Sequence, residues 1–201
     1  GFGGYRFGKL FTVATKKRQA RLAWEDVERF ILADGDLMEC FRIQDYKSLI
    51  TAWETGCTIE ALSREGGLDE GFRSIYASID EIHQHRDNKI YKAIYNGQRS
   101  LKEALTSMIT TRGDDLNSFC FEMDEYCQAI LAGGSTAENF FVDIYSLDDG
   151  DDIFAPEYFL KSNPVLCQTE EGMETMMADA QTARDAGGRE LADYITKCQN
   201  M

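Results

Sequence analysis

The two histidines of the chain lie in one short polar segment, Asp80-Glu-Ile-His-Gln-His-Arg-Asp87, whose residue types could bind a metal. On a helix, Asp80 and His83 would share a face at i,i+3 spacing, and so would Glu81 and His85 at i,i+4 spacing. A di-iron bundle needs two Glu-x-x-His units and two further carboxylates, whereas this chain has one such unit with Asp in place of Glu. We interpret the segment as the polar end of a helix, with Asp80 and His83 as candidate metal ligands.

A second group of carboxylates falls in a glycine-containing segment at 148–152, which predicts a loop. Hard cations such as Ca²⁺ prefer oxygen ligands, and four aspartates could supply them here: Asp148, Asp149, Asp151 and Asp152. The spacing does not match an EF-hand, because aligning Gly150 with the glycine of that motif puts Tyr145 and Leu147 at ligand positions. We interpret the segment as a solvated acidic loop, with weak calcium binding as the alternative, and no metal site is predicted.

The sequence carries no familiar motif for covalent or nucleotide chemistry. It has no G-x-S-x-G elbow, no Walker loop, no H-E-x-x-H and no glycine-rich turn from a strand into a helix. A histidine and a cysteine could meet in space as a nucleophilic pair, but no protease signature surrounds any cysteine. The chain is therefore predicted to be non-enzymatic and to hold no cofactor.

Six cysteines occur, and their pairing is left open by the sequence. On one helix Cys120 and Cys127 would lie about 10 Å apart along the axis, so they could not bridge each other. Buried thiols and at least one disulfide both remain possible for the set. There is no C-x-x-C, which argues against a structural zinc site or a thioredoxin-type redox centre.

Apolar residues recur at helical spacing along most of the chain, which has two prolines. The clearest pattern predicts a helix over 114–132, and similar patterns predict helices at 23–33, 44–55, 68–85, 170–185 and 188–198. Capping boxes at Ser100-Leu-Lys-Glu103 and Ser135-Thr-Ala-Glu138 predict helices over 100–109 and 135–145. No stretch alternates convincingly with a period of two. The predicted fold is all-α: an antiparallel helical bundle over about 68–147, flanked by shorter helices and an extended N-terminal arm.

The arm, residues 1–22, contains six basic side chains and no acidic one. Such an arm could be a solvated terminus, dock on a protein or an anionic membrane, or contact nucleic acid. Protein docking is the interpretation adopted for its aromatic and basic residues: Phe2, Tyr5, Arg6, Phe7, Lys9, Phe11, Lys16, Lys17, Arg18 and Arg21. Residues 23–201 are predicted to form a single acidic helical domain, with a subdivision near 148–165 as the alternative.

Composition limits the function further. The hydrophobic fraction of 43% and charged fraction of 28% are those of a globular protein, and no apolar run reaches the length of a membrane span. The net charge of −14 argues against nucleic acid as a partner. We predict an accessory or structural subunit docked on the protein subunits of a larger assembly, for example an organellar membrane complex.

Two alternatives to the docked subunit stay open. One is a secreted, viral or bacterial effector that binds another protein through its helical surface, and the other is a helical protein that binds a metal weakly. Because the sequence starts with Gly1 rather than Met, processing is one interpretation. It would place the protein in an organelle lumen, on a peripheral membrane complex or outside the cell.

Overall fold

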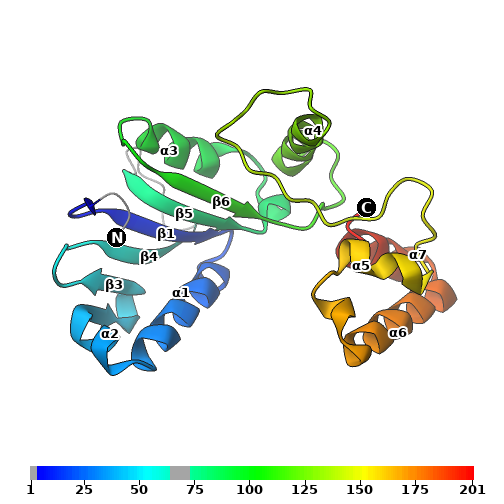
Figure 1. Ribbon diagram of the computed structural model, residues 1–201, viewed down its shortest axis with the longest axis horizontal. Coiled ribbons are helices and arrows are strands. Elements are labelled where there is room, and N and C mark those ends of the chain that lie inside the picture. The colour runs from blue at the N-terminus through cyan, green and yellow to red at the C-terminus, as the bar shows by residue number, and fades with distance from the viewer. Residues whose placement is uncertain (1–3, 64–72) are drawn as a thin grey trace. The chain divides into compact units, whose positions relative to one another are not determined.

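The computed structural model describes residues 4–63 and 73–201. The chain divides into two compact units, unit 1 (residues 1–110) and unit 2 (residues 111–201). Unit 1 is built on a six-stranded mixed β-sheet, whereas unit 2 is helical with long extended connections (Figure 1). The predicted all-α bundle is therefore wrong, because the chain is an α/β protein. The division at residues 110 and 111 also differs from the predicted boundaries at 22 and near 148–165.

The sheet of unit 1 has the strand order β2-β3-β4-β1-β5-β6. In chain order the strands are β1 (Lys9–Ala14), β2 (Phe41–Gln44), β3 (Leu49–Ala52), β4 (Thr58–Ser63), β5 (Ser74–Asp80) and β6 (Leu105–Ile109). Strands β4, β1, β5 and β6 are parallel, and β2 and β3 form an antiparallel hairpin on the β4 side. The chain leaves β1 toward β4 and later returns to the other side of β1 as β5. Such a reversal is a topological switch point, and open α/β sheets bind ligands there, at the carboxyl ends of the strands.

Strand β1 is the buried centre of the sheet rather than part of an extended arm. Phe11, Thr12, Val13 and Ala14 are all at most 7% exposed. A parallel strand covered on both faces reads as a nearly continuous apolar run, without the polar alternation that marks a half-exposed strand. The predicted N-terminal arm is therefore wrong, since six of its residues form the central strand and others begin a helix.

Strand β5 replaces the helix predicted over 68–85, of which residues 68–72 lie outside the described part. Its residues Ile75, Ala77 and Ile79 are buried at i, i+2, i+4 spacing, the period of a strand. The bulky residues Ile75, Tyr76 and Ile79 are spaced as on a helix, which explains the wrong prediction.

Helices cover both faces of the sheet. On one face lies α1 (Lys17–Leu32), whose buried Trp24 packs in a cluster with Ile50 and Ala61. The indole Nε1 of Trp24 donates to the carbonyl oxygen of Ile59 on β4 at 3.4 Å. Helix α3 (Lys89–Gln98) contacts β5, and Figure 1 draws it above the strands, whereas α1 lies below them. Right-handed crossovers that run in opposite directions along a sheet place their helices on opposite faces in this way. A short helix, α2 (Gly35–Cys40), follows α1.

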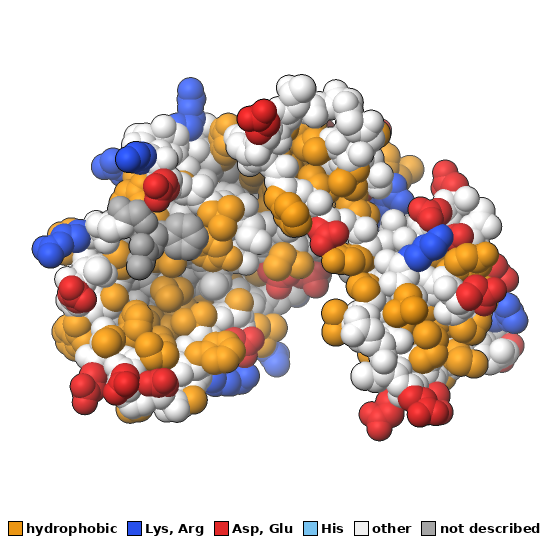
Figure 2. All heavy atoms as spheres, viewed as in Figure 1, with side chains coloured by type: hydrophobic (Ala, Val, Ile, Leu, Met, Phe, Trp, Pro, Cys, Tyr) orange, Lys and Arg blue, Asp and Glu red, His pale blue; other side chains and the backbone are white. Residues whose placement is uncertain are grey.

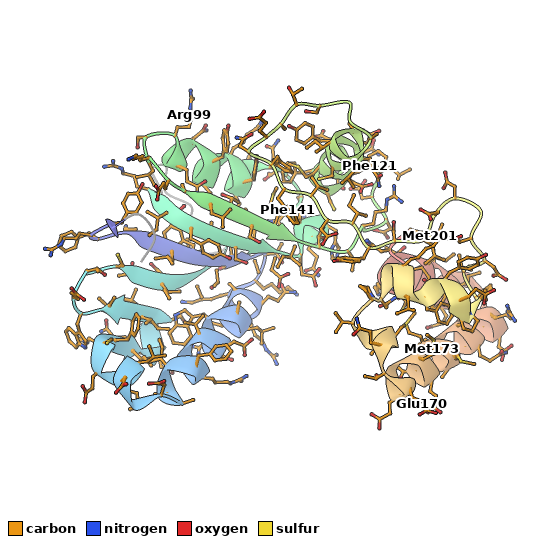
Figure 3. The ribbon with its side chains drawn as sticks, in the orientation of Figure 1. Arg99, Phe121, Phe141, Glu170, Met173 and Met201 are labelled. Atoms are coloured by element: carbon orange, nitrogen blue, oxygen red, sulfur yellow. The ribbon has the colours of Figure 1, made fainter. Side chains whose placement is uncertain are left out.

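Unit 2 contains α4 (Phe119–Leu131), α5 (Phe159–Ser162), α6 (Glu170–Ala186) and α7 (Gly188–Asp193). Its core is formed by Phe159, Met176, Ala180 and Tyr194, with Met173 of α6 packed against them (Figure 3). The helix α6 begins with an N-cap, because the Thr169 hydroxyl accepts the N–H of Gly172 at 3.1 Å.

The helices predicted at 23–33, 114–132, 170–185 and 188–198 are confirmed by α1, α4, α6, and α7 with the π-helical turn Tyr194–Cys198. The helices predicted at 44–55 and 100–109 are wrong, since those segments hold the β2–β3 hairpin and β6. The helix predicted at 135–145 is also wrong, because residues 134–155 form turns and extended chain. Within residues 4–63 and 73–201, no helix is both long and apolar enough to cross a membrane.

Candidate nucleotide site at the carboxyl edge of the sheet

Polar residues lie at or directly after the carboxyl ends of three neighbouring parallel strands of unit 1. The register pairs Asp80, the last residue of β5, with Ile109, the last residue of β6, and pairs Ile79 with Val13 of β1. The residues that follow are Glu81, Thr110 and Thr15. Because the strands are parallel, these side chains gather at one edge of the sheet, at the switch point between β1 and β5.

Two consecutive carboxylates, Asp80 and Glu81, stand at the end of β5. The main chain of Glu81 adopts the left-handed conformation, with φ 53° and ψ 53°, although the residue is not glycine. This conformation turns the chain sharply, and Asp80 Oδ1 accepts the N–H of Glu81 at 2.9 Å. His85, which is 5% exposed, supports the turn with its Nε2 3.2 Å from the carbonyl oxygen of Asp80. Strained backbone of this kind concentrates at functional sites.

His83 connects the end of β5 to the end of β6. Its Nδ1 lies 3.1 Å from Oε2 of Glu81 and 2.9 Å from Oγ1 of Thr110. Its main-chain N–H also donates to Oγ1 of Thr110 at 3.1 Å. Residues 82–84 form the 3-10 turn that presents the imidazole in this position.

Amide and hydroxyl groups line the side of this edge nearest β1. Nε2 of Gln19 donates to Oε1 of Gln84 at 3.3 Å, and the Thr15 hydroxyl lies 3.1 Å from Oε1 of Gln19 and 3.4 Å from Oε1 of Gln84. Gln19 lies in the first turn of α1, directly after β1. The cluster links β1, α1 and the turn after β5 around the switch point.

The donor set at this edge fits a magnesium ion that carries a phosphate ligand. Among residues 4–63 and 73–201 there is no group of three His, Cys, Asp or Glu side chains that could hold a metal by itself. Mg²⁺ rarely uses such an all-protein cage, since it binds through one or two carboxylates and takes its other oxygens from phosphates and water. An aspartate at a strand end that holds Mg²⁺ is a recurring part of P-loop ATPases. Asp80 has the position and the chemistry for that part.

The glycine-rich loop that cradles phosphates is not present in complete form. Gly3 to Lys9 matches G-x-x-x-x-G-K, but Leu10 stands where Ser or Thr is needed. The fold gives a second reason, because Gly8 and Lys9 lead into β1, whereas a phosphate loop opens a helix. Gly8 has a packing role instead: a Cβ atom there would lie 2.8 Å from Cδ1 of Ile75.

The predicted partner-binding residues are dispersed in the structure. Lys9 and Phe11 belong to β1, and the Tyr5 hydroxyl accepts the N–H of Glu103 at 2.9 Å. Arg21 is engaged within the fold, by Glu25 at 3.0 Å and Asp45 at 2.7 Å. Three of the cations stay exposed around the start of α1: Lys16, Lys17 and Arg18. Phe7 is 80% exposed, Arg6 is exposed as well, and Phe2 lies outside the described residues. Partner binding by these side chains stays a prediction.

Of the predicted metal candidates, Asp80 and His83 come together at the carboxyl edge, but on a strand end and a turn rather than on a helix. The acidic loop has a cation of its own, because Nζ of Lys161 lies 2.6 Å from both Asp148 and Asp151. These contacts raise the pKa of Lys161 to about 12 and lower the pKa of Asp151. Asp149 points into solvent, and Asp152 accepts the N–H of Phe154.

Three of the cysteines have the opposite of an activated thiol. Burial raises the pKa of the Cys127, Cys167 and Cys198 thiols, whereas a nucleophilic cysteine needs a lowered pKa. Cys120 is buried, with Sγ 3.4 Å from the carbonyl oxygen of Arg112.

Comparison with known proteins bears on the same part of the chain. The family model "Terminase large subunit, ATPase domain" matches residues 2–129. Protein YmfN of Escherichia coli (strain K12) is 26% identical over 162 residues, which are 78% of this chain and 34% of YmfN. The large terminase of bacteriophage HK97 superposes with a TM-score of 0.80 at 19% identity, over 98% of this chain and 40% of the terminase chain. The chain thus spans well under half the length of both proteins.

These matches correct the predicted function. A non-enzymatic accessory subunit is wrong, because the matching family is defined by an ATPase domain. The superposition on the phage terminase shows that the six-stranded α/β fold is shared. The family model spans more than half of the residues and covers every strand of the sheet together with Asp80, Glu81, His83 and Thr110. The chain belongs to the family of the terminase large subunit ATPase domain.

Proposed function

We propose that the carboxyl edge of β1, β5 and β6 is the magnesium–nucleotide site of an ATPase that drives DNA packaging. The observation that carries the proposal is the pair Asp80–Glu81 at the end of β5, beside the switch point of the sheet. The family match supports the ATPase activity, and the HK97 superposition supports the fold that positions the pair.

The two carboxylates have different tasks in this proposal. Asp80 holds Mg²⁺, which neutralises charge on the phosphate oxygens when it is bound. Glu81 is one residue further along, at the left-handed turn of the main chain, and its side chain is 35% exposed, so its carboxylate is available to orient the attacking water. Removing a proton from that water, or holding it in line, is work for an ionised carboxylate, which accepts hydrogen bonds and donates none.

The residues placed at this edge include carboxylates, amides and hydroxyls but no glycine-rich phosphate loop. The sequence has no complete G-x-x-x-x-G-K-[ST] loop, and such a loop and its lysine bind the phosphates in P-loop ATPases. The chain therefore supplies the metal-binding and water-orienting half of the proposed site. Turnover belongs to the complete ATPase in which both halves are present.

DNA and other packaging proteins are the partners that this function implies, so the prediction against nucleic acid is withdrawn. The charge argument behind it changes once the chain is divided. Residues 111–201 hold 19 acidic and five basic side chains, whereas residues 1–110 hold 16 of each. The whole net charge of −14 therefore belongs to unit 2, and unit 1 meets no overall repulsion from a polyanion. The earlier prediction of a larger assembly agrees with a packaging complex.

The test is paramagnetic NMR with Mn²⁺ and ATP, since Mn²⁺ replaces Mg²⁺ at oxygen sites and broadens nearby signals. In the 201-residue chain we expect the amide signals of residues 80–85 and of Thr110 to broaden when Mn²⁺–ATP is added. The Asp80→Asn variant should lose this broadening, because it removes the anionic ligand but keeps the shape of the side chain. A matched control, Asp87→Asn, changes a carboxylate in the same segment that is not at the strand end.

Two results would contradict the proposal. One is the absence of selective broadening at the carboxyl edge in the wild-type chain. The other is equal broadening in the wild type and Asp80→Asn, which would show that the cation binds elsewhere.

A further inference from the structure

We propose that His83 is a positioning residue for the ATPase reaction: it holds the Glu81 carboxylate in its working orientation, and Thr110 in turn holds His83. The inference deepens the proposed function and rests on it, since the orientation of Glu81 matters only if Glu81 acts on the attacking water. The three groups come from the end of β5, the turn after it and the end of β6.

The hydrogen-bonding capacity of the groups determines where the proton is. An ionised carboxylate only accepts hydrogen bonds, so the 3.1 Å contact between Oε2 of Glu81 and Nδ1 of His83 needs a proton on Nδ1. Oγ1 of Thr110, 2.9 Å from Nδ1, lies within reach of the same proton. The structure therefore assigns a proton to Nδ1 of His83, directed at Glu81 and Thr110.

Thr110 is suited to fix the ring, because it contacts both the main chain and the side chain of His83. Oγ1 accepts the main-chain N–H of His83 at 3.1 Å, in addition to its contact with Nδ1. The ring is 23% exposed and the Glu81 side chain 35% exposed. A partly exposed glutamate has several rotamers available in water, and a fixed donor beside one oxygen selects among them.

The position of Thr110 makes this contact a connection between strands. β6 ends at Ile109, and Thr110 is the first residue after it, where unit 1 ends in the sequence. A shift of the main chain at Thr110 would move His83 and thereby the carboxylate of Glu81. The orientation of Glu81 is thus tied to the end of β6 as well as to β5.

The first experiment tests the geometry without turnover. Long-range ¹H–¹⁵N NMR of the 201-residue chain reports which imidazole nitrogen carries hydrogen. We expect a protonated-type Nδ1 signal for His83 in the wild type and in Thr110→Ser, which keeps the hydroxyl. In Thr110→Val and in Glu81→Ala we expect the Nδ1 signal of His83 to differ from that of the wild type. A His83 ring protonated at Nε2 alone in the wild type would overturn the inference.

The second experiment measures turnover in the complete ATPase. Loss of an outer-shell partner typically lowers activity about 10- to 100-fold, so His83→Ala should lower kcat by that factor and leave KM for ATP unchanged. His83→Asn should restore most of the rate, because its amide N–H₂ reaches the position of Nδ1. Melting curves of the variants confirm that they are folded.

The outcomes separate the two proposals. If Glu81→Gln lowers kcat while His83→Ala leaves it unchanged, His83 has no positioning role but the site stands. If Asp80→Asn and Glu81→Gln both leave turnover unchanged, the proposed function itself fails. If His83→Ala lowers kcat and His83→Asn lowers it equally, His83 has a role other than donating a hydrogen bond from Nδ1. This result also overturns the inference.

Discussion

Glu81 combines a strained main chain with a charged side chain at the end of β5. For residues other than glycine, the left-handed conformation costs about 1–2 kcal/mol relative to the right-handed one. We expect the free energy of unfolding of Glu81→Gly to be about 1 kcal/mol larger than that of Glu81→Ala. The glycine variant should therefore unfold at a higher denaturant concentration. The order is the reverse of that in an ordinary helix or strand, where alanine is the more stable residue.

Alanine is the matched control in this comparison, because both variants lose the contact with His83 and differ only in the Cβ atom. Chemical denaturation followed by circular dichroism gives the two midpoints. Equal midpoints would mean that the left-handed turn stores no strain. Both variants should lose the function proposed for the carboxylate, so they should differ in stability but not in activity.

At the scale of single residues, the sequence pattern selects two residues of the proposed site, but as ligands on a helix rather than as residues at the end of a strand. Asp80 and His83 stood out as possible ligands on one helix face, but the structure joins them through a strand end and a turn. A usable signal was present: the run Ser-Ile-Tyr-Ala-Ser-Ile before Asp80 reads as a buried strand that ends in two acids. Thr110 had no such signal, because its role depends on the register of β6 against β5.

At the scale of elements, the start of α6 shows how closely two segments can pack. Gly172 lies in its first turn, and a Cβ atom there would overlap the carbonyl oxygen of Leu166 and lie 2.9 Å from Oγ1 of Thr169. Gly172→Ala must displace either the preceding turn or the N-cap, so we expect a loss of about 1–3 kcal/mol in the free energy of unfolding.

Gly35, the first residue of α2, is the control for this prediction. It also lies in the first turn of a helix, but a Cβ atom there would meet nothing within 4 Å. Gly35→Ala should be neutral or stabilise by up to about 1 kcal/mol, since alanine restricts the unfolded chain. Thermal melts of the two variants side by side would settle the comparison, and equal effects would contradict the packing argument.

The helices of this chain were easier to predict than its strands, and the reason is physical. Helix α6 has an N-cap, acidic residues in its first turn, including Glu170 (Figure 3), and one buried face, all of which are local features. Strand β1 is covered on both faces, so its residues show little polar alternation, and in β5 the alternation is masked by the helical spacing of Ile75, Tyr76 and Ile79. The β2–β3 hairpin turns at Ser48, a non-glycine residue with φ 52°, so the turn lacks the Asn-Gly or Asp-Gly pair that marks a tight hairpin in a sequence.

At the scale of the whole molecule, charge is distributed very unevenly between the two units. Figure 2 shows acidic side chains gathered over the surface of unit 2, the part that contains α5, α6 and α7. A DNA backbone would be repelled by that surface. Exposed cations occur in unit 1 around the start of α1, where Lys16, Lys17 and Arg18 follow β1 and the first turn contains no acidic residue.

We therefore expect DNA binding by this chain to depend on unit 1. The double variant Lys16→Gln, Lys17→Gln should weaken binding to duplex DNA. It should also reduce the slope of log K against log salt by about 0.9 for each lost phosphate contact. Fluorescence anisotropy at several salt concentrations measures both quantities.

The matched control neutralises charge in unit 2, through Glu170→Gln and Glu171→Gln at the start of α6. This variant should bind DNA with the wild-type slope, and with equal or slightly higher affinity because repulsion is reduced. If the salt slope changes in the Glu170, Glu171 variant but not in the Lys16, Lys17 variant, the DNA contacts unit 2. That result would contradict the expectation.

Strand β6 pairs with β5 and, among the residues that the structure describes, has no strand on its other side. Leu105 and Ile109 at its two ends are 47% and 60% exposed. An edge strand presents a row of unpaired N–H and C=O groups, which can template the addition of another strand. A strand added there in parallel would have its carboxyl end beside Thr110, at the same edge of the sheet as Asp80 and Glu81. Growth of the sheet at β6 would therefore bring new groups to the edge that holds the proposed site.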